Sequence, residues 1–230
     1  MRHAAKVRTV AAGAAVLGLV LSGCSALQIR TAERDSGPLR VAVEEKAGEN
    51  PTTAPPDDGV PEGMKEVSVN LGAECPVDVS LAMTDDWTEG SVTDDFHSFS
   101  RGTSMADSDM TLITCTKGYD ETPQSLVDSR KKYTFSEKDS SVLAQRSGSL
   151  AAGSYWSYQG LLGPTEIFAI NQKSTVMYGV LIGYKTNGRL VEIKIDMRAL
   201  ESDTEAAEEF KKMLPTITVD GEKVPTPRFK

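Results

Sequence analysis

The chain has few of the residues that most often carry out chemistry in proteins. Among its 230 residues are three cysteines and two histidines, and aromatic residues make up 6%. It contains no Gly-x-Ser-x-Gly turn, no glycine-rich phosphate loop and no Cys-x-x-Cys pair. Nucleotide cofactors, zinc and the nucleophile turn of α/β hydrolases therefore have no support in the sequence, and we expect neither a cofactor nor a metal.

The longest apolar run lies near the start of the chain and is too short to cross a membrane. Three basic residues precede it, and it extends from Val10 to Leu21. A membrane-spanning helix needs about 20 apolar residues. A basic region followed by a short apolar run and small residues, here Ser22 and Gly23, is typical of a secretion signal. We expect residues 1–23 to be removed and the rest of the chain to act outside the cytoplasm.

The residues Leu21-Ser22-Gly23-Cys24 resemble the lipobox of bacterial lipoproteins. This resemblance implies cleavage between Gly23 and Cys24, a diacylglycerol on the Cys24 sulfur, and a lipid-anchored position on the extracytoplasmic face of the cell membrane. Removing the signal, with its three basic residues and no acid, takes the formal charge from −8 to −11. An acidic chain is repelled by phosphate, which argues against nucleic acid as a partner.

Cys75 and Cys115 remain after Cys24 is lipidated. In an oxidising compartment, two cysteines favour a disulfide. Its loop of about 40 residues corresponds to roughly 4 kcal/mol of stabilisation in the chain-entropy estimate. A metal or redox pair is the alternative, although the spacing is far from Cys-x-x-Cys and His97 is the one histidine left in the processed chain.

Composition divides the processed chain into a tether and one domain. Residues 24–64 are rich in proline, threonine and acidic residues, and such segments bury too little apolar surface to fold, so we expect a flexible tether. From residue 65 to residue 230, apolar residues recur at strand or helix spacing. The predicted strands cover residues 67–71, 77–81, 110–116, 142–147, 154–159, 166–171, 175–184, 190–197 and 217–219.

Two helices interrupt the strands. Thr122 and Pro123 are suited to the N-cap and first position of a helix ending near Thr134. A second helix is expected over residues 205–213, capped by Ser202 or Asp203 and ended by Pro215, with its glutamates and lysines largely outward. Asn187-Gly188 between two alternating runs predicts a β-hairpin. These elements indicate an α+β fold, with a mostly antiparallel sheet covered by two main helices.

The order of these elements resembles a known fold. With Trp87 after the second strand and Leu214-Pro215-Thr216-Ile217 after the last helix, residues 65–224 resemble the PsbP/Mog1-like fold, and within it the actinobacterial LpqN/LpqT-type lipoproteins. The resemblance implies a non-catalytic envelope or accessory protein. It transfers no site residue.

Polar clusters give weak indications of chemistry. His97 has carboxylates and serines nearby in sequence, but adjacent strand residues face opposite sides, so a loop or edge-strand histidine is favoured over a catalytic one. The acidic pairs Asp85-Asp86, Asp94-Asp95 and Asp107/Asp109 lack the spacing of an EF-hand, and solvated turns explain them better than calcium binding.

The aromatic segment around Trp156 is the candidate binding site. Trp156 and Tyr158 share one face of a strand, and Leu161 and Leu162 follow in a glycine-bounded loop. If these four residues are exposed, they form a patch that binds a protein or an envelope component. Packing in the core under the helices is the interpretation that the sequence favours for them. The function predicted is a non-catalytic binding or accessory module. A carrier of an acyl or isoprenoid ligand and an envelope hydrolase centred on His97 are the rivals.

Overall fold

The structure, a computed structural model, describes residues 59–102 and 109–230. The predicted signal peptide, Cys24 and nearly all of the tether lie outside these residues, as does Asp107. No helix within the described ranges is long and apolar enough to cross a membrane.

The described strands form two antiparallel sheets. The smaller sheet has the order β1-β2-β10-β11 and consists of β1 (Lys65–Asn70), β2 (Asp78–Met83), β10 (Thr218–Val219) and β11 (Glu222–Lys223). The larger sheet has the order β3-β4-β5-β9-β8-β7-β6. Its strands are β3 (Thr88–Thr93), β4 (Phe96–Arg101), β5 (Asp109–Lys117), β6 (Ser141–Leu150), β7 (Gly153–Leu162), β8 (Thr175–Thr186) and β9 (Arg189–Leu200).

The hairpin between β8 and β9 forms where the sequence predicts it. Asn187 and Gly188 both have positive φ, 48° and 74°, which a two-residue turn with the twist of a hairpin requires. The register therefore pairs Thr186 with Arg189 and continues to Thr175 and Leu200.

Both predicted helices are present in the described part of the chain. Helix α1 (Pro123–Lys131) begins with Thr122 as N-cap, whose hydroxyl accepts from the Ser125 N–H, and it ends three residues before the predicted end. Helix α2 (Thr204–Met213) is capped by the Asp203 carboxylate. Two short 3₁₀ turns, η1 (Ile170–Gln172) and η2 (Leu214–Thr216), complete the helical segments.

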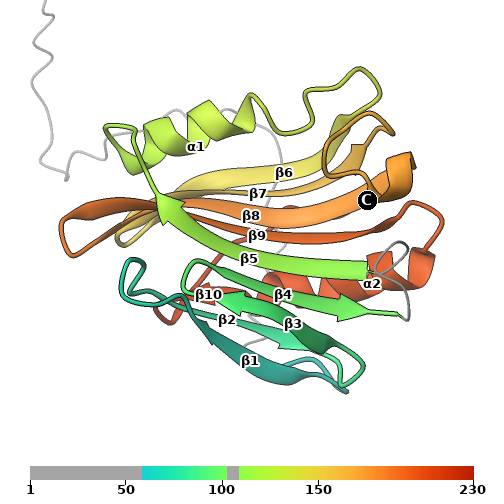
Figure 1. Ribbon diagram of the computed structural model, residues 1–230, viewed down its shortest axis with the longest axis horizontal. Coiled ribbons are helices and arrows are strands. Elements are labelled where there is room, and N and C mark those ends of the chain that lie inside the picture. The colour runs from blue at the N-terminus through green and yellow to red at the C-terminus, as the bar shows by residue number, and fades with distance from the viewer. Residues whose placement is uncertain (1–58, 103–108) are drawn as a thin grey trace, which may run out of the picture. The chain divides into compact units, whose positions relative to one another are not determined.

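The two sheets and the helices form layers with two hydrophobic clusters between them. Figure 1 shows α1 on one side of the larger sheet and the strands of the smaller sheet on the other. The main cluster lies between the larger sheet, the smaller sheet and α2, and includes Ile195, Phe210 and Met213, all fully buried. A second cluster beneath α1 contains Val127, Trp156 and Leu181. The fold is thus α+β and mostly antiparallel, as predicted.

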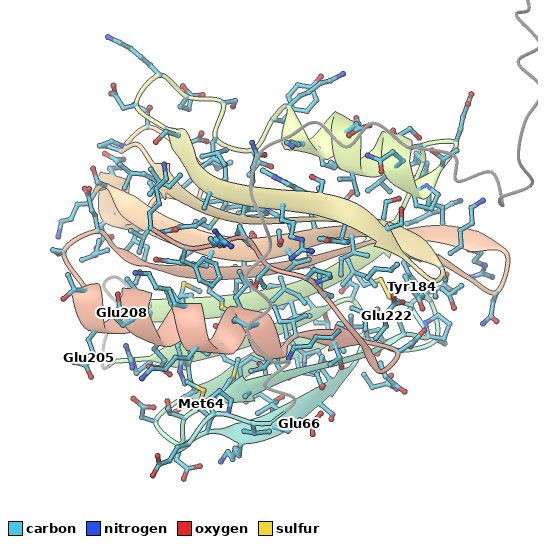
Figure 2. All side chains as sticks on the ribbon, turned by 180° about the vertical axis from the view of Figure 1, so that it is seen from behind. Met64, Glu66, Tyr184, Glu205, Glu208 and Glu222 are labelled. Atoms are coloured by element: carbon cyan, nitrogen blue, oxygen red, sulfur yellow. A yellow bond between two sulfur atoms is a disulfide. The ribbon has the colours of Figure 1, made fainter. Side chains whose placement is uncertain are left out.

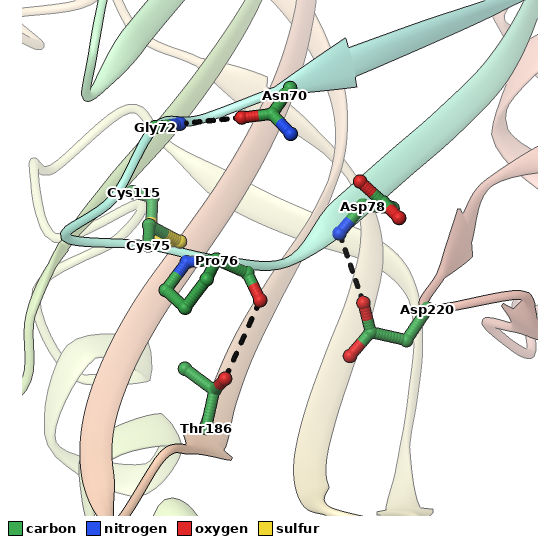
Figure 3. The surroundings of a disulfide bond; sticks show 8 residues. All are labelled: Asn70, Gly72, Cys75, Pro76, Asp78, Cys115, Thr186 and Asp220. Carbon is green, nitrogen blue, oxygen red and sulfur yellow. Dashed lines mark hydrogen bonds between the residues drawn. A yellow bond between two sulfur atoms is a disulfide. The ribbon is translucent and has the colours of Figure 1, made fainter.

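A disulfide joins the two sheets. Cys75, in the connection between β1 and β2, is bonded to Cys115 of β5, with Cα atoms 6.2 Å apart. Figure 3 shows that the same connection is also fixed to the β8–β9 turn, because the Thr186 hydroxyl donates to the Pro76 carbonyl at 3.5 Å. At its far end, the Asp78 N–H donates to Asp220 Oδ1 at 2.9 Å. The disulfide therefore stabilises the packing of one sheet on the other.

Three predictions about local structure are wrong. Strands β3 and β4 lie between residues 81 and 110, where the sequence predicts no strand; every residue of β3 is exposed, so this strand shows no apolar alternation. The predicted strand at 166–171 is a turn followed by η1, and Asn171 and Gln172 have positive φ there. Glu209, predicted to face outward, has a side chain 11% exposed because it pairs with Arg101.

The pair between Arg101 and Glu209 is the centre of a network that fixes α2. Arg101 also donates to Asp109 Oδ2 at 2.9 Å, and the Trp87 indole N–H donates to Glu209 Oε1 at 2.7 Å. Burial raises the pKa of Asp109, against the opposing effect of its hydrogen bond with Arg101. Asp109 therefore contributes to a structural network instead of a solvated turn. The other described acidic residues of the predicted pairs, Asp85, Asp86, Asp94 and Asp95, are exposed.

Candidate binding face

The aromatic residues of the candidate binding patch are in the core. Trp156 and Tyr158 are fully buried and Leu162 is 1% exposed, so the favoured core packing is confirmed and the candidate surface patch is wrong for these three. The physical reason is that α1 and the Phe135 ring cover this part of β7: the Phe135 centroid is 6.3 Å from that of Trp156 and 5.6 Å from that of Tyr158. Leu161 is half-buried and, like Leu162, belongs to β7 and not to a loop.

Within residues 59–102 and 109–230, helix α1 covers one half of its side of the larger sheet and no second α-helix covers the other half. Its buried Val127 packs with side chains of β7 and β8. Beyond β8, the same face continues across β9, β5 and β4, as the register of these strands shows. There Phe96, Met110 and Leu112 are half-buried and belong to neither hydrophobic cluster. We call this surface, with Phe168, Lys194, Asp196 and Arg198, the open face.

A charged row on β9 forms the centre of the open face. Lys194, Asp196 and Arg198 occupy alternate positions and therefore point to the same side. Lys194 Nζ lies 2.7 Å from Asp196 Oδ2. Asp196 and Arg198 are 5% and 8% exposed, which is unusual for charged residues on a sheet surface. The row is therefore held in place by burial and pairing.

Tyr158 connects the charged row to the core beneath α1. Its hydroxyl donates to Asp196 Oδ1 at 2.5 Å. Burial of the phenol, followed by the charge of Asp196, raises the pKa of Tyr158 well above 10, so this tyrosine stays neutral and remains a donor. The carboxylate of Asp196 thus has a partner on each oxygen.

The Phe168 ring contacts both ends of the charged row, Lys194 and Arg198. Its ring centroid lies 4.7 Å from Lys194 Nζ and 5.3 Å from Arg198 Cζ, distances at which cations are attracted to an aromatic ring. Arg198 also donates to the Phe168 carbonyl at 3.1 Å, while its buried Nε has no hydrogen-bond partner among the described residues. Burial lowers the pKa of Arg198, against the opposing charge of Asp196. Phe168 itself is 44% exposed and the adjacent Ile167 is 86% exposed.

The arrangement suits binding. Its aromatic, aliphatic and arginine side chains are of the types that dominate the centres of protein interfaces. Sequence reasoning missed this site. A signal for it is present in β9, where polar and apolar residues alternate. Glu192, Lys194, Asp196 and Arg198 lie on one face, and Ile193, Ile195 and Met197 lie on the other. A charged row on one face of a central strand indicates that no helix fully covers that face.

His97 lies on the other side of the larger sheet. It is 9% exposed and pairs in register with Ile113, a residue of the main cluster. Its neighbour Ser98 points to the opposite face and donates to the Ser91 carbonyl at 3.3 Å. From the sequence we expect His97 in a loop or an edge strand. This placement is wrong, because β4 pairs with β3 on one side and with β5 on the other.

Hollows on the described surface are lined by charged, polar and apolar residues together. One of about 350 Å³ adjoins the disulfide and is bordered by Glu74, Asp94, Asp95, Lys117 and Arg189. Another, of about 440 Å³, lies beside α2, where Figure 2 shows Glu205, Glu208 and Met64. Fully buried side chains occupy the space between α2 and the larger sheet.

Comparisons with known proteins give neighbours of similar fold. No known family and no curated protein matches the chain. Mycobacterium tuberculosis LpqN, described as involved in cell envelope biogenesis, is 13% identical with a TM-score of 0.45, and the match covers 70% of this chain and 92% of LpqN. The Ran-binding protein Mog1p of Saccharomyces cerevisiae is 10% identical with a TM-score of 0.42, covering 66% and 85%.

A third neighbour is the cyanobacterial PsbP of Synechocystis, 10% identical with a TM-score of 0.40, covering 74% of this chain and 99% of that protein. The solved structures similar to this chain thus include LpqN and Mog1- and PsbP-like folds, which are the proteins that the order of elements resembles. At these identities the likeness concerns the fold and assigns no role to a residue.

Proposed function

We propose that this chain is a lipid-anchored protein of the cell envelope whose domain binds another protein without catalysing a reaction. The basic, apolar and small residues up to Cys24 support the anchor. Two acyl chains on Cys24, of the kind that palmitate supplies, hold a protein at a membrane, whereas a single chain binds marginally. The domain then acts on the extracytoplasmic face.

The open face is the binding surface in this proposal, and the position of Phe168 is the observation that carries it. An exposed aromatic ring stands over two cations, and half-buried apolar residues extend the surface across β5 and β4. Because Asp196 and Tyr158 fix the charged row, little side-chain entropy is lost when a partner docks there.

The surroundings of His97 support a non-catalytic role. A nucleophile and its base must lie within hydrogen-bonding reach. Ser98, the serine next to His97, projects from the other side of β4, and the nearest charged contact of His97 Nδ1 is Glu89 Oε1 at 3.5 Å. A ligand carrier would need an enclosed apolar cavity, and the fully buried Phe210, Met213 and Ile195 fill the place between sheet and helix where it would lie.

A quantitative pull-down tests the binding role. The full chain, solubilised in detergent with its anchor, is compared with an Ile167→Ser/Phe168→Ala variant and with Tyr119→Ala as matched control. Tyr119 is 82% exposed and follows β5 at the end of the sheet away from Arg198. We expect the double variant to lose about tenfold or more of the captured envelope polypeptide, and the control to retain it.

Circular dichroism verifies that both variants are folded. Equal capture by all three proteins would contradict the proposed face. A lipid-sized mass bound to the purified chain in native mass spectrometry would favour the carrier.

A further inference from the structure

The last six residues of the chain lie against the side of the larger sheet that faces away from α1. Ser157 and Gln159 alternate with Trp156 and Tyr158 along β7 and therefore point to that side. They are 0% and 4% exposed, which is rare for polar side chains. Residues 225–230, which we call the C-terminal tail, provide three of their hydrogen bonds, and the Arg146 carbonyl and the Tyr178 hydroxyl provide the others.

The sheet contacts the main chain of the tail. The Ser157 hydroxyl donates to the Pro225 carbonyl at 2.7 Å. Gln159 binds Lys230 twice: its Oε1 accepts from the Lys230 N–H at 2.8 Å, and its Nε2 donates to the Lys230 main-chain oxygen at 3.2 Å. Arg146 of β6 donates to the Thr226 carbonyl at 3.4 Å. These contacts select an extended backbone more than particular side chains.

One aromatic ring and two prolines of the tail provide the side-chain selectivity that its main-chain contacts do not. Phe229 packs edge-on against Tyr178, with ring centroids 5.7 Å apart. Pro227 is buried, and Pro225 and Pro227 alternate with Thr226 and Arg228 up to Phe229. Prolines at alternate positions keep a segment extended at low entropic cost, as in other proline-rich ligands. The bound pattern is thus Pro-x-Pro-x-Phe.

The tail is attached in a way that allows release. It belongs to none of the described strands, so its removal breaks no ladder hydrogen bond. Segments held by a few side-chain contacts open at much lower free energy than the central strands of a sheet. Release leaves Ser157 and Gln159 without the partners that the tail supplies, which favours refilling of the site by another peptide.

We propose that the surface formed by Arg146, Ser157, Gln159 and Tyr178, on which the tail lies, is a peptide-binding site for a partner protein, and that the tail is its internal competitor. The partner segment is extended, with proline at two alternate positions and an aromatic residue two positions later. This second site lies on the opposite side of the sheet from the open face. An experiment that disproves binding at one site therefore does not disprove binding at the other.

Competition by the tail determines the affinity that a binding experiment should measure. A tethered segment acts at an effective concentration on the order of millimolar. The apparent affinity of the intact chain for a free peptide equals the intrinsic affinity of the site multiplied by the fraction of molecules in which the tail has left it. Removing the tail therefore exposes the full affinity of the site.

Fluorescence anisotropy with a labelled peptide of residues 225–230 tests this. The chain ending at Val224 is expected to bind it saturably, and at least about tenfold more tightly than the intact chain does. The Phe229→Ala peptide is expected to bind at least about tenfold more weakly, which corresponds to loss of an aromatic contact. A folded truncated chain that does not bind the peptide, or binds it no better than the intact chain, would overturn the proposal.

Hydrogen exchange of the intact chain gives an answer even when the truncated chain does not fold. The Lys230 amide, which donates to Gln159, is expected to exchange at least about a hundredfold faster than the Val180 amide in the central strand β8. Exchange of both amides at one common rate would show that the tail leaves only when the domain unfolds, and would overturn the proposal.

Discussion

The Tyr158 hydroxyl crosses β8 to donate a hydrogen bond to Asp196 on β9, at 2.5 Å. Gly179 makes this possible, because it lies between the two residues in register and carries no side chain. A Cβ at this position would stand 2.7 Å from the Tyr158 hydroxyl and 2.5 Å from the Ile195 carbonyl. The core beneath α1 and the charged row of the open face are thus connected across a glycine.

Gly179→Ala should therefore destabilise the domain. We expect the free energy of unfolding to fall by about 1–3 kcal/mol, because the added methyl group displaces backbone or the Tyr158 ring. Urea unfolding measures this. Thr116→Ala, at an exposed position of β5, is the control and should change stability by no more than about 0.5 kcal/mol. A Gly179→Ala variant as stable as the control would show that the crossing is not tightly packed.

The disulfide should contribute a large part of the stability. Replacing both Cys75 and Cys115 by serine should lower the free energy of unfolding by about 4 kcal/mol, because the unfolded chain then regains the entropy of a 40-residue loop. Reduced wild-type protein should match the double variant in urea unfolding. Equal stability of oxidised and reduced protein would contradict this assignment.

Stability should depend on Tyr184 at high pH. Burial, and then its hydrogen bond to Asp220, raise the pKa of Tyr184 to about 12, from 10.0. Folding thus favours the neutral phenol, so its contribution is complete below about pH 10 and is lost as the pH rises to about 12. The difference in unfolding free energy between wild type and Tyr184→Phe should shrink over this interval. A difference that does not change with pH would contradict the shift.

Membrane attachment should depend on Cys24. In cells that make the full chain, Cys24→Ser should abolish incorporation of labelled palmitate and move the protein out of the membrane fraction, since the acyl chains supply the attachment. Ser25→Ala, next to the cysteine, should leave both unchanged. Membrane association of Cys24→Ser at the wild-type level would rule out the anchor.

Much of the fold follows from local signals in the sequence. Asn187-Gly188 predicts the hairpin because both residues tolerate positive φ, and Thr122-Pro123 predicts the start of α1 because a cap and a proline are suited to adjacent positions there. Strand β3 could not be predicted, since a strand at the edge of a sheet with all its residues exposed has no apolar period.

The site was harder to predict than the fold. Whether Trp156 lies in the core or at the surface depends on where α1 packs. The residues next to Trp156 in the sequence do not determine where that helix packs. The charged row of β9 is visible as an alternation, but its approach to Phe168 depends on the turn after Pro164, where a strand was predicted instead. Contacts between distant segments decide both outcomes.

Site-specific photo-crosslinking in living cells tests the binding face most directly. A photoreactive phenylalanine analogue is placed at Ile167, which is 86% exposed beside Phe168, and in a second protein at Tyr119, which is 82% exposed at the far end of the sheet. We predict a discrete crosslinked polypeptide from position 167 that disappears when Phe168 is also replaced by alanine, and none from position 119. The same crosslinks from both positions, or none from 167, would contradict the open face as the binding surface.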